Sequence, residues 1–187
     1  MGMATLVIFG GGGVGSIVVL QDRDLLPVLI GDQEWWWSIA MGVAAGAFAG
    51  SAAWWLVSTP FMRTVMDRYV DRIGPLMVRP MDRWYIALCA GVGEEIFFRG
   101  AIQYWLGLWS TAILFVAIHG YLDPRRWRLC IYGVALTLLM VGFGVWAQHA
   151  GLLGPMAAHT VLDVILLDGL HRAWRDRARA TPGHACG

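Results

Sequence analysis

Three charged residues lie within six positions of an otherwise apolar stretch, residues 84–109. They are Glu94, Glu95 and Arg99. A charged side chain near the centre of a bilayer costs about 2.5–3.5 kcal/mol on insertion scales, so each needs a partner or a function. Glu95 and Arg99 are four residues apart on a helix and can form an ion pair. Glu94 points about 100° away around the helix and has no local partner, so it is the candidate general base or acid.

Two histidines and a further acid lie in later apolar stretches. His119 is near the end of residues 109–120, and His159 and Asp163 share one helix face within residues 151–170. At about 1.5 Å per residue, Glu94 and His119 each lie roughly 15 Å inside the edge of their stretch. Because the depths match, we expect all four side chains to meet in one cavity.

Such a group of side chains is compatible with two chemistries. It can activate a water molecule by general-base catalysis and stabilise an oxyanion. It can also bind a divalent metal ion, since imidazole and carboxylate are usual metal ligands. Each residue alone has a structural explanation as well: His119 as a hydrogen-bonded core histidine, and His159 with Asp163 as a pair that stabilises one helix. Residue types alone leave these alternatives open.

The elements that must position these residues are long apolar helices. The pattern predicts an all-α fold, a polytopic membrane helical bundle with about six transmembrane helices. A tight turn at residues 107–110 is expected to separate the third span from the fourth, and the fourth is short for a full crossing. The six expected spans are residues 3–20, 35–57, the stretch from residue 84 to that turn, 109–120, 129–148 and 151–170.

Residues 61–73 have a different pattern. Apolar side chains recur at helical spacing on one face, and arginines and aspartates occupy the other. This predicts an interfacial amphipathic helix at the membrane surface. The alternative is a short helix packed on the protein itself. The apolar face comprises Met62, Val65, Met66, Tyr69, Val70 and Ile73.

A glycine-rich run in the first span matches a nucleotide-binding pattern. Residues 10–15 fit G-x-G-x-x-G, and Asp32 lies about twenty residues further on, where a ribose-binding acid is expected. The segments around them form no βαβ unit, which that pattern requires. Glycines in a membrane helix allow close helix packing, and we favour this interpretation.

Composition limits the remaining possibilities. The chain has 187 residues, of which 58% are hydrophobic and eleven are Trp, which is too apolar for an ordinary soluble domain. A net charge of +1 gives no indication of nucleic-acid binding. We expect a single membrane-embedded domain over residues 1–187, with its motif-bearing core at 84–170 and a frayed, Arg-rich tail at 171–187. The scattered residues Cys89, Cys130 and Cys186 indicate neither a metal site nor a disulfide.

The arginines predict the orientation in the membrane. All fourteen cationic side chains are Arg, and twelve of them lie after the second, fourth and sixth expected spans. Because positive charge stays on the cytoplasmic side, both termini should be inside. The N-terminus lacks the basic region and cleavage site of a signal peptide, so the first span is expected to be retained.

Three motifs in this order resemble a known family. Glu94-Glu95-Ile-Phe-Phe-Arg99 fits E-E-x-x-x-R, Phe115-Val-Ala-Ile-His119 fits F-x-x-x-H, and His159-Thr-Val-Leu-Asp163 fits H-x-x-x-N with Asp in place of Asn. These motifs are similar to those of the CAAX prenyl protease and bacteriocin-processing family, also called the Abi family. The resemblance covers residues 94–163.

The resemblance implies an intramembrane glutamic endopeptidase. By analogy, Glu94 activates the attacking water with help from His119. His159 and the residue at 163 stabilise the oxyanion, and Glu95 and Arg99 support the site. No cofactor is implied, with a divalent metal ion as the minority alternative. The expected partners are the lipid bilayer and a membrane-associated protein or peptide substrate, and the expected location is the bacterial inner membrane.

The departure at position 163 matters because an ionised Asp accepts hydrogen bonds and would repel an oxyanion. Either Asp163 is protonated, or it orients His159 through one ring nitrogen and leaves the other to act. We favour the second possibility. Other functions remain open: a non-catalytic membrane immunity or partner protein on the same fold, a metal-dependent membrane hydrolase, or a small transporter or channel.

Overall fold

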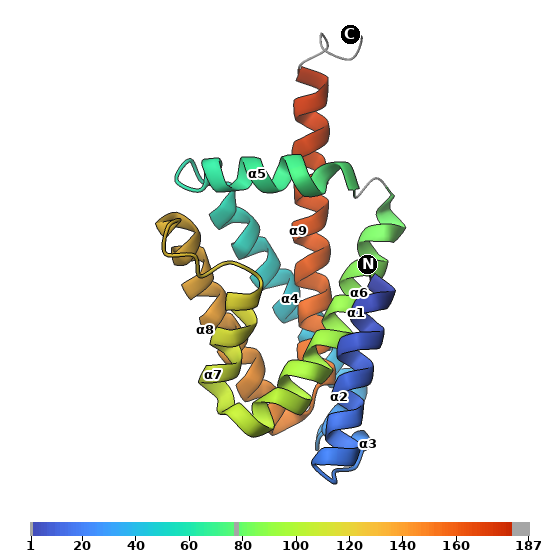
Figure 1. Cartoon of the computed structure of the whole chain (residues 1–187). Coiled ribbons are helices and arrows are strands. Elements are labelled where there is room, and N and C mark those ends of the chain that lie inside the picture. Colours follow the sequence, from blue (N-terminus) through green and yellow to red (C-terminus); the bar gives the residue numbers. More distant parts are fainter. Residues whose placement is uncertain (1, 77–78, 181–187) are drawn as a thin grey trace.

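The computed structural model describes residues 2–76 and 79–180, and every regular element in these ranges is helical (Figure 1). Five helices are long and apolar enough to cross a membrane: Gly2–Leu20, Trp35–Val57, Pro80–Ile118, Trp127–Ala150 and Leu153–Ala180. The all-α prediction of a membrane helical bundle is confirmed. The glycine-rich run is helical throughout, so the βαβ unit that a nucleotide site would need is missing from it.

The helices follow one another with short connections. The first spanning helix consists of α1 (Gly2–Thr5), η1 (Leu6–Gly11), α2 (Gly12–Gly15) and η2 (Ser16–Leu20). The remaining elements are α3 (Leu25–Ile30), α4 (Trp35–Val57), α5 (Arg63–Ile73), η3 (Gly74–Leu76), α6 (Pro80–Glu95), η4 (Ile96–Ile102), α7 (Gln103–Ile118), α8 (Trp127–Ala150) and α9 (Leu153–Ala180).

The expected third and fourth spans are two arms of one bent helical segment. The backbone of Gly107 has φ +75° and ψ 175°, which is not helical, and the chain reverses there (Figure 1). A positive φ of this kind is readily available only to glycine. The arm after Gly107 ends at Ile118 and is too short to count as a separate spanning helix, so the count is five where the sequence predicted about six.

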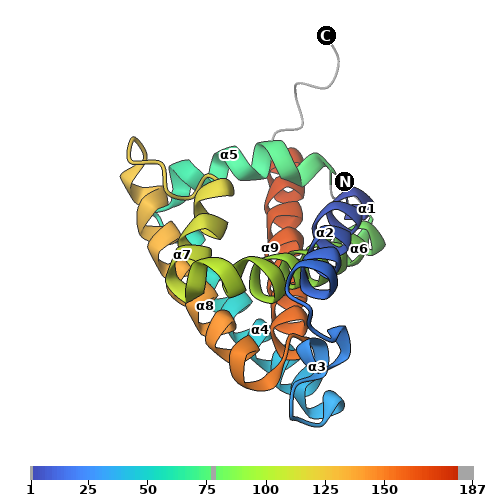
Figure 2. The same ribbon diagram turned by 60° about the horizontal axis from the view of Figure 1, so that its bottom comes forward.

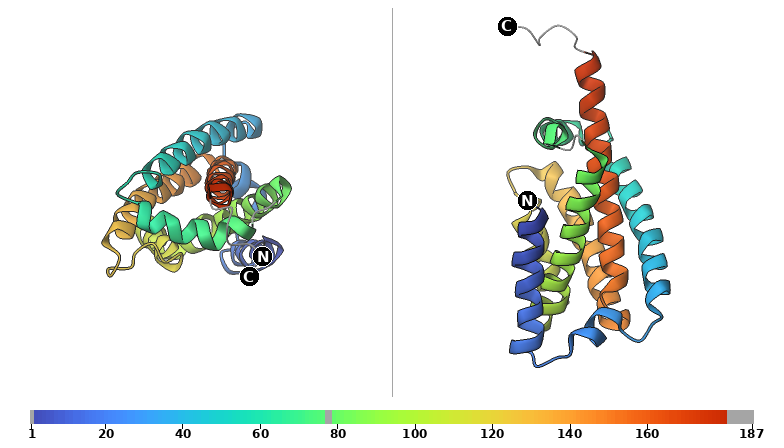
Figure 3. Two further views of the ribbon diagram at one scale, coloured as in Figure 1. Left: turned by 90° about the horizontal axis from the view of Figure 1, so that it is seen from above. Right: turned by 90° about the vertical axis from the view of Figure 1, so that its right-hand side faces the viewer.

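Helix α9 lies in the middle of the bundle and packs against α4 and α6 (Figure 3). Glycines make the contact with α4 close: Gly42, Gly46 and Gly50 are buried along one face of α4. A Cβ atom at Gly46 would clash with the carbonyl oxygen of Ala158 and lie 2.8 Å from its Cα atom. Because Ala158 precedes His159, this packing fixes the part of α9 that carries the third motif.

Helix α5 lies across one end of the bundle (Figure 1). Its polar face carries exposed arginines, as predicted, but Met62 and Val70 on the apolar side are buried by the protein itself. Arg177 of α9 forms ion pairs with Asp67 and Asp71. The apolar face of α5 therefore packs on the protein itself, the alternative to an apolar face in contact with the membrane.

Most of the expected tail is not frayed. Residues 171–180 continue α9 as a regular helix, and residues 181–187 lie outside the described part. Ion pairs to α5, and a contact of 3.2 Å between Nδ1 of His171 and the carbonyl oxygen of Gly74, hold this extension. The sequence did not indicate these partners because they lie about one hundred residues away in the chain.

Candidate active site

The first motif lies where α6 changes its winding. Glu94 and Glu95 end α6, and the π-helical segment η4 begins at the next residue and contains Arg99. The wider winding of a π-helix shifts side chains around the axis, and such segments are frequent at functional sites. Glu94 and Glu95 are both buried, and they face the part of the bundle that contains α7 and α9.

Glu94 Oε2 lies between two imidazole rings. Nε2 of His119 is 3.7 Å away and Nε2 of His159 is 4.0 Å away. These separations exceed a direct hydrogen bond, but they would allow one water molecule to contact the carboxylate and an imidazole. The structure therefore brings the predicted acid and both predicted histidines to one place.

Glu95 connects the first motif to the third. Its Oε1 is 2.9 Å from Nδ1 of His159, and its Oε2 is 3.2 Å from Nε of Arg99. A carboxylate paired with Arg is an acceptor only, so Nδ1 of His159 carries a proton and donates it. The expected ion pair of Glu95 and Arg99 is present, and Glu95 also fixes the ring of His159 so that Nε2 faces Glu94.

His119 is oriented by its own helix. Its Nδ1 is 2.7 Å from the carbonyl oxygen of Phe115, which can only accept, so Nδ1 donates and Nε2 is directed at Glu94. The ring of His119 also packs on Phe115 at 4.4 Å and lies parallel to Tyr121 at 6.3 Å. Burial raises the pKa of the Tyr121 phenol far above its usual range, so this neighbour stays uncharged.

Asp163 reaches the site from α9, but not in the position that we expected. Its Oδ2 is 3.7 Å from Nε2 of His159, while Nδ1 of that ring is held by Glu95. The orienting contact that the sequence assigned to Asp163 thus belongs to Glu95. Asp163 instead faces the nitrogen that is free to act, on the same side as Glu94.

The site is partly open. The side chains of His119 and Asp163 are 33% and 29% exposed, whereas those of Glu94 and His159 are 11% and 6% exposed. A substrate could therefore contact His119 and Asp163 while Glu94 stays shielded. Tyr121, next to His119, also lines a cavity of about 70 Å³ under α5, so the site lies toward the α5 end of the bundle.

Several neighbours of the site were not predicted from the sequence. The guanidinium of Arg99 lies 4.8 Å from the ring centre of Phe115, and its Nη2 donates to Sδ of Met140 at 2.8 Å. Phe115 therefore separates Arg99 from His119. For Phe115, its place in the F-x-x-x-H motif was the one feature of the sequence that indicated a position beside the site. Nothing in the sequence singles out Met140.

A ligand set for a metal ion is not found in the part of the chain that the structure describes. No three His, Cys, Asp or Glu side chains there are arranged so that they could hold one. The two Nδ1 atoms are already engaged, and only the Nε2 atoms and the carboxylates of Glu94 and Asp163 face one another. Independence from metal ions stays a prediction.

A glycine allows the helices that carry Glu95 and His159 to approach each other. A Cβ atom at Gly91 would clash with Oγ1 of Thr160 and lie 2.8 Å from its backbone nitrogen. We expect Gly91→Val to push α6 away from α9 and to lower the free energy of unfolding by about 1–3 kcal/mol. Thermal unfolding in detergent, monitored by circular dichroism, would measure this. Gly142→Val is the control because no atom lies within 4 Å of its Cβ position, and equal stability of the two variants would contradict the packing role.

The segment that contains this site is similar to known proteins. Residues 79–165 match the family model described as type II CAAX prenyl endopeptidase Rce1-like, which confirms the resemblance predicted from the three motifs. The uncharacterized protein YpbD of Bacillus subtilis (strain 168) is 33% identical over 82 residues, which cover 43% of this chain and 41% of that protein. The chain thus spans about two fifths of the length of this relative. No solved structure matches the chain.

Proposed function

We propose that this chain, whose residues 79–165 match the Rce1-like family, is an intramembrane endopeptidase in which Glu94 activates the attacking water. The observation that carries the proposal is the position of Glu94 Oε2, 3.7 Å from Nε2 of His119 and 4.0 Å from Nε2 of His159. One water molecule beside these groups could donate a hydrogen bond to the carboxylate and lie close to both rings.

The reaction can be written with these groups alone. The oxygen of the water molecule forms a bond to the carbonyl carbon of the substrate while Glu94 takes a proton from that water. The π electrons of the carbonyl group move to the carbonyl oxygen. The tetrahedral intermediate then expels the amine, which receives the proton from Glu94. His119, whose Nε2 is directed at Glu94, helps to orient the water.

His159 is the group best placed to stabilise the oxyanion. Its Nδ1–H is held by Glu95, and Nε2 is flanked by the carboxylates of Glu94 and Asp163. When the ring carries a proton on both nitrogens, its Nε2–H can donate to the developing negative charge. Arg99 neutralises Glu95 and holds it in place, which makes Arg99 a positioning residue.

We expect Asp163→Asn to keep the cleavage rate within about tenfold of that of the unchanged chain. An asparagine here would still reach the region of Nε2 of His159 and would offer an N–H donor to the oxyanion. The rate of product formation by the purified variant measures this. A loss as large as that expected for a variant of Glu94 would mean that the carboxylate of Asp163 itself takes part in proton transfer.

We propose that the reaction needs no metal ion. The described site offers two ring nitrogens and two carboxylates that face one another, and both other ring nitrogens are engaged, while no three such side chains in the described residues are arranged to hold a metal ion. Activity should therefore be unchanged after dialysis against a chelator such as EDTA or 1,10-phenanthroline, as measured by cleavage rate. Inactivation that is reversed by added zinc would contradict this.

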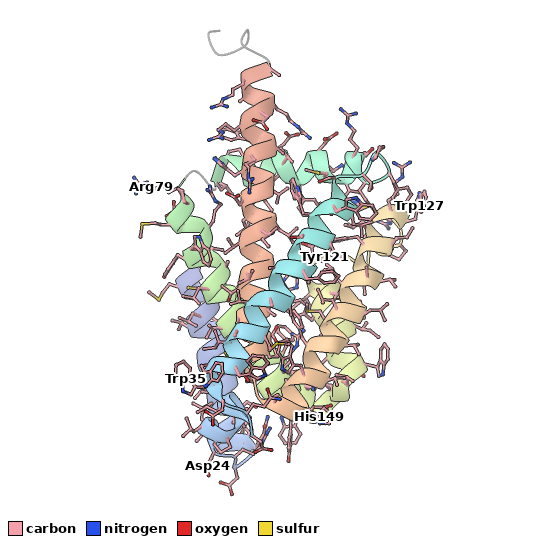
Figure 4. All side chains as sticks on the ribbon, turned by 180° about the vertical axis from the view of Figure 1, so that it is seen from behind. Asp24, Trp35, Arg79, Tyr121, Trp127 and His149 are labelled. Carbon is pink, nitrogen blue, oxygen red and sulfur yellow. The ribbon has the colours of Figure 1, made fainter. Side chains whose placement is uncertain are left out.

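The proposed substrate is a membrane-associated protein or peptide, and the proposed location is the bacterial inner membrane with both termini in the cytoplasm. The arginine-rich segments support this orientation. Helix α5, the start of α6 at Arg79, the start of α8 at Trp127 and the end of α9 all lie at one end of the bundle (Figures 1 and 4). The site lies toward that end, so a substrate would enter from the cytoplasmic side.

Comparing protein termini in cells tests the proposal. Cells that carry the unchanged chain are compared with cells that carry Glu94→Ala, and membrane proteins are analysed by mass spectrometry of their N- and C-terminal peptides. We expect at least one membrane protein whose terminus is shifted only when Glu94 is present. If the biological phenotype of the chain persists in the variant with no shifted terminus, the chain acts as a non-catalytic partner.

A further inference from the structure

A polar cavity, separate from the small cavity under α5, lies at the end of the bundle opposite α5. It has a volume of about 520 Å³, within the range of small-molecule sites. Figure 4 labels Asp24, Trp35 and His149 at this end, and Figure 2 shows α3 beside the connection between α8 and α9. The backbone nitrogen of Leu152 donates to the carbonyl of Leu29 at 2.9 Å, which fixes α3 there. The polar lining comprises Arg23, Asp32, Arg99, Gln103, Tyr104, Gln148 and His149.

Arg99 forms the inner wall of this cavity. Its side chain is buried, with Nε on Glu95 and Nη2 on the weak acceptor Sδ of Met140, while Nη1 has no hydrogen-bond partner. An unpartnered guanidinium nitrogen in the interior is costly. An acceptor that reaches the inner wall would complete the hydrogen bonding of Arg99.

Arg23 is held at the same cavity by a defined chain of contacts. Its Nη1 donates to Oε1 of Gln21 at 3.1 Å, and its guanidinium lies 5.6 Å from the ring centre of Tyr104. Gln21 is itself buried and donates to the carbonyl oxygen of Ala101 at 3.0 Å. The position of Arg23 is therefore determined by the fold and is not that of a freely moving surface side chain.

The guanidinium groups at the cavity favour an anion. Arg23 and Arg99 line it beside one acid, Asp32. The charge of Arg99 is balanced by Glu95, so an anion would meet the charge of Arg23 and the unpartnered Nη1 of Arg99. Gln103 is buried and uses its Nε2 on the carbonyl of Gly144. Guanidinium groups recognise planar or tetrahedral oxyanions through charge-assisted hydrogen bonds.

We infer that this cavity binds an oxyanion, the carboxylate or phosphate of a ligand that arrives from the side of the membrane opposite α5. The ligand lies between Arg23 at the rim and Arg99 at the inner wall. The cavity is not lined by Glu94 or by the two histidines near it, and Arg99 is the residue that joins the two regions, because its Nε contacts Glu95. The inference stands on these contacts and does not depend on the proposed peptidase activity.

The test measures binding to the full-length purified chain with inorganic phosphate as the probe. Thermal unfolding is followed in neutral detergent at constant ionic strength, with chloride replacing phosphate so that general screening is unchanged. We expect a saturable rise in the midpoint temperature. Arg23→Gln should weaken the apparent affinity about tenfold or more, which corresponds to the loss of about one charge-assisted hydrogen bond. Arg23→Lys should retain most of it.

Arg125→Gln is the matched control, because Arg125 is exposed and lies two residues before Trp127, which Figure 4 labels at the other end of the bundle. Nanodiscs of phosphatidylcholine or phosphatidylglycerol distinguish the sources of the anion. Stabilisation by phosphatidylglycerol alone, abolished by Arg23→Gln, identifies a lipid head group, and stabilisation by phosphate in phosphatidylcholine identifies a soluble anion. The inference is overturned if neither stabilises the chain, or if Arg125→Gln loses as much binding as Arg23→Gln.

Discussion

Replacing Glu94 with glutamine is expected to lower the rate of peptide-bond cleavage by about a hundredfold to ten-thousandfold, the usual range for loss of a general base. The amide has nearly the same shape but cannot accept a proton from water. The carboxylate makes only contacts of 3.7 Å and 4.0 Å to the two rings, so the variant should fold normally. Single-turnover cleavage by the purified variant in lipid bilayers, using the substrate found from shifted termini, measures the effect.

Glu34→Gln is the matched control for that experiment. Glu34 is exposed and lies just before α4, at the end of the bundle opposite α5, where Trp35 is labelled in Figure 4. Its activity should equal that of the unchanged chain. If Glu94→Gln keeps more than about a tenth of the rate, another group must be the base, because even weak general-base catalysis contributes about a hundredfold.

Replacing His159 with glutamine should cost about a hundredfold to a thousandfold in rate, the range for removal of one oxyanion donor. The change removes Nε2–H and also the 2.9 Å contact that Nδ1 makes with Glu95. Because the ring is buried, thermal unfolding must be measured with the rate, so that lost activity can be separated from lost structure.

His171→Gln is the matched control for His159→Gln. His171 is also buried on α9. Its Nδ1 contacts the carbonyl oxygen of Gly74, just as Nδ1 of His159 contacts an oxygen of Glu95. It lies at the contact with η3 and away from the site. A direct role of His159 is supported if the two variants have similar stability, His171→Gln keeps its activity and His159→Gln loses most of it. An equal loss of activity in both would point to a general effect on α9.

The helices were predictable because their signal is local. Long apolar runs, the aspartates and arginines of α5 and the turn at Gly107 are all visible within windows of about twenty residues. The number of crossing helices was less predictable, since the arm after Gly107 is short and belongs to the same bent segment, Pro80–Ile118, as α6 and η4. The helical extension of α9 beyond His171 depends on distant partners in α5 and η3.

The group of site residues was predictable, but their pairing was not. Spacing along a helix showed that Glu95 could reach Arg99, and depth suggested that Glu94, His119 and His159 could meet. Which carboxylate holds His159 depends on the rotation of α6 relative to α9, and this depends on contacts such as that of Gly91 with Thr160. Sequence spacing favoured Asp163, the nearer residue in the chain, whereas the three-dimensional packing places Glu95 there.

The central claim is that Glu94 faces both histidines and that a water molecule binds beside these three side chains. Electron cryomicroscopy of the protein in lipid nanodiscs, at a resolution that shows ordered water, tests it most directly. The account predicts a water molecule within hydrogen-bonding distance of Glu94 Oε2 and of Nε2 of His119 or His159. A Glu94 side chain turned away from both rings, or a dry space filled by apolar side chains or lipid, would contradict it.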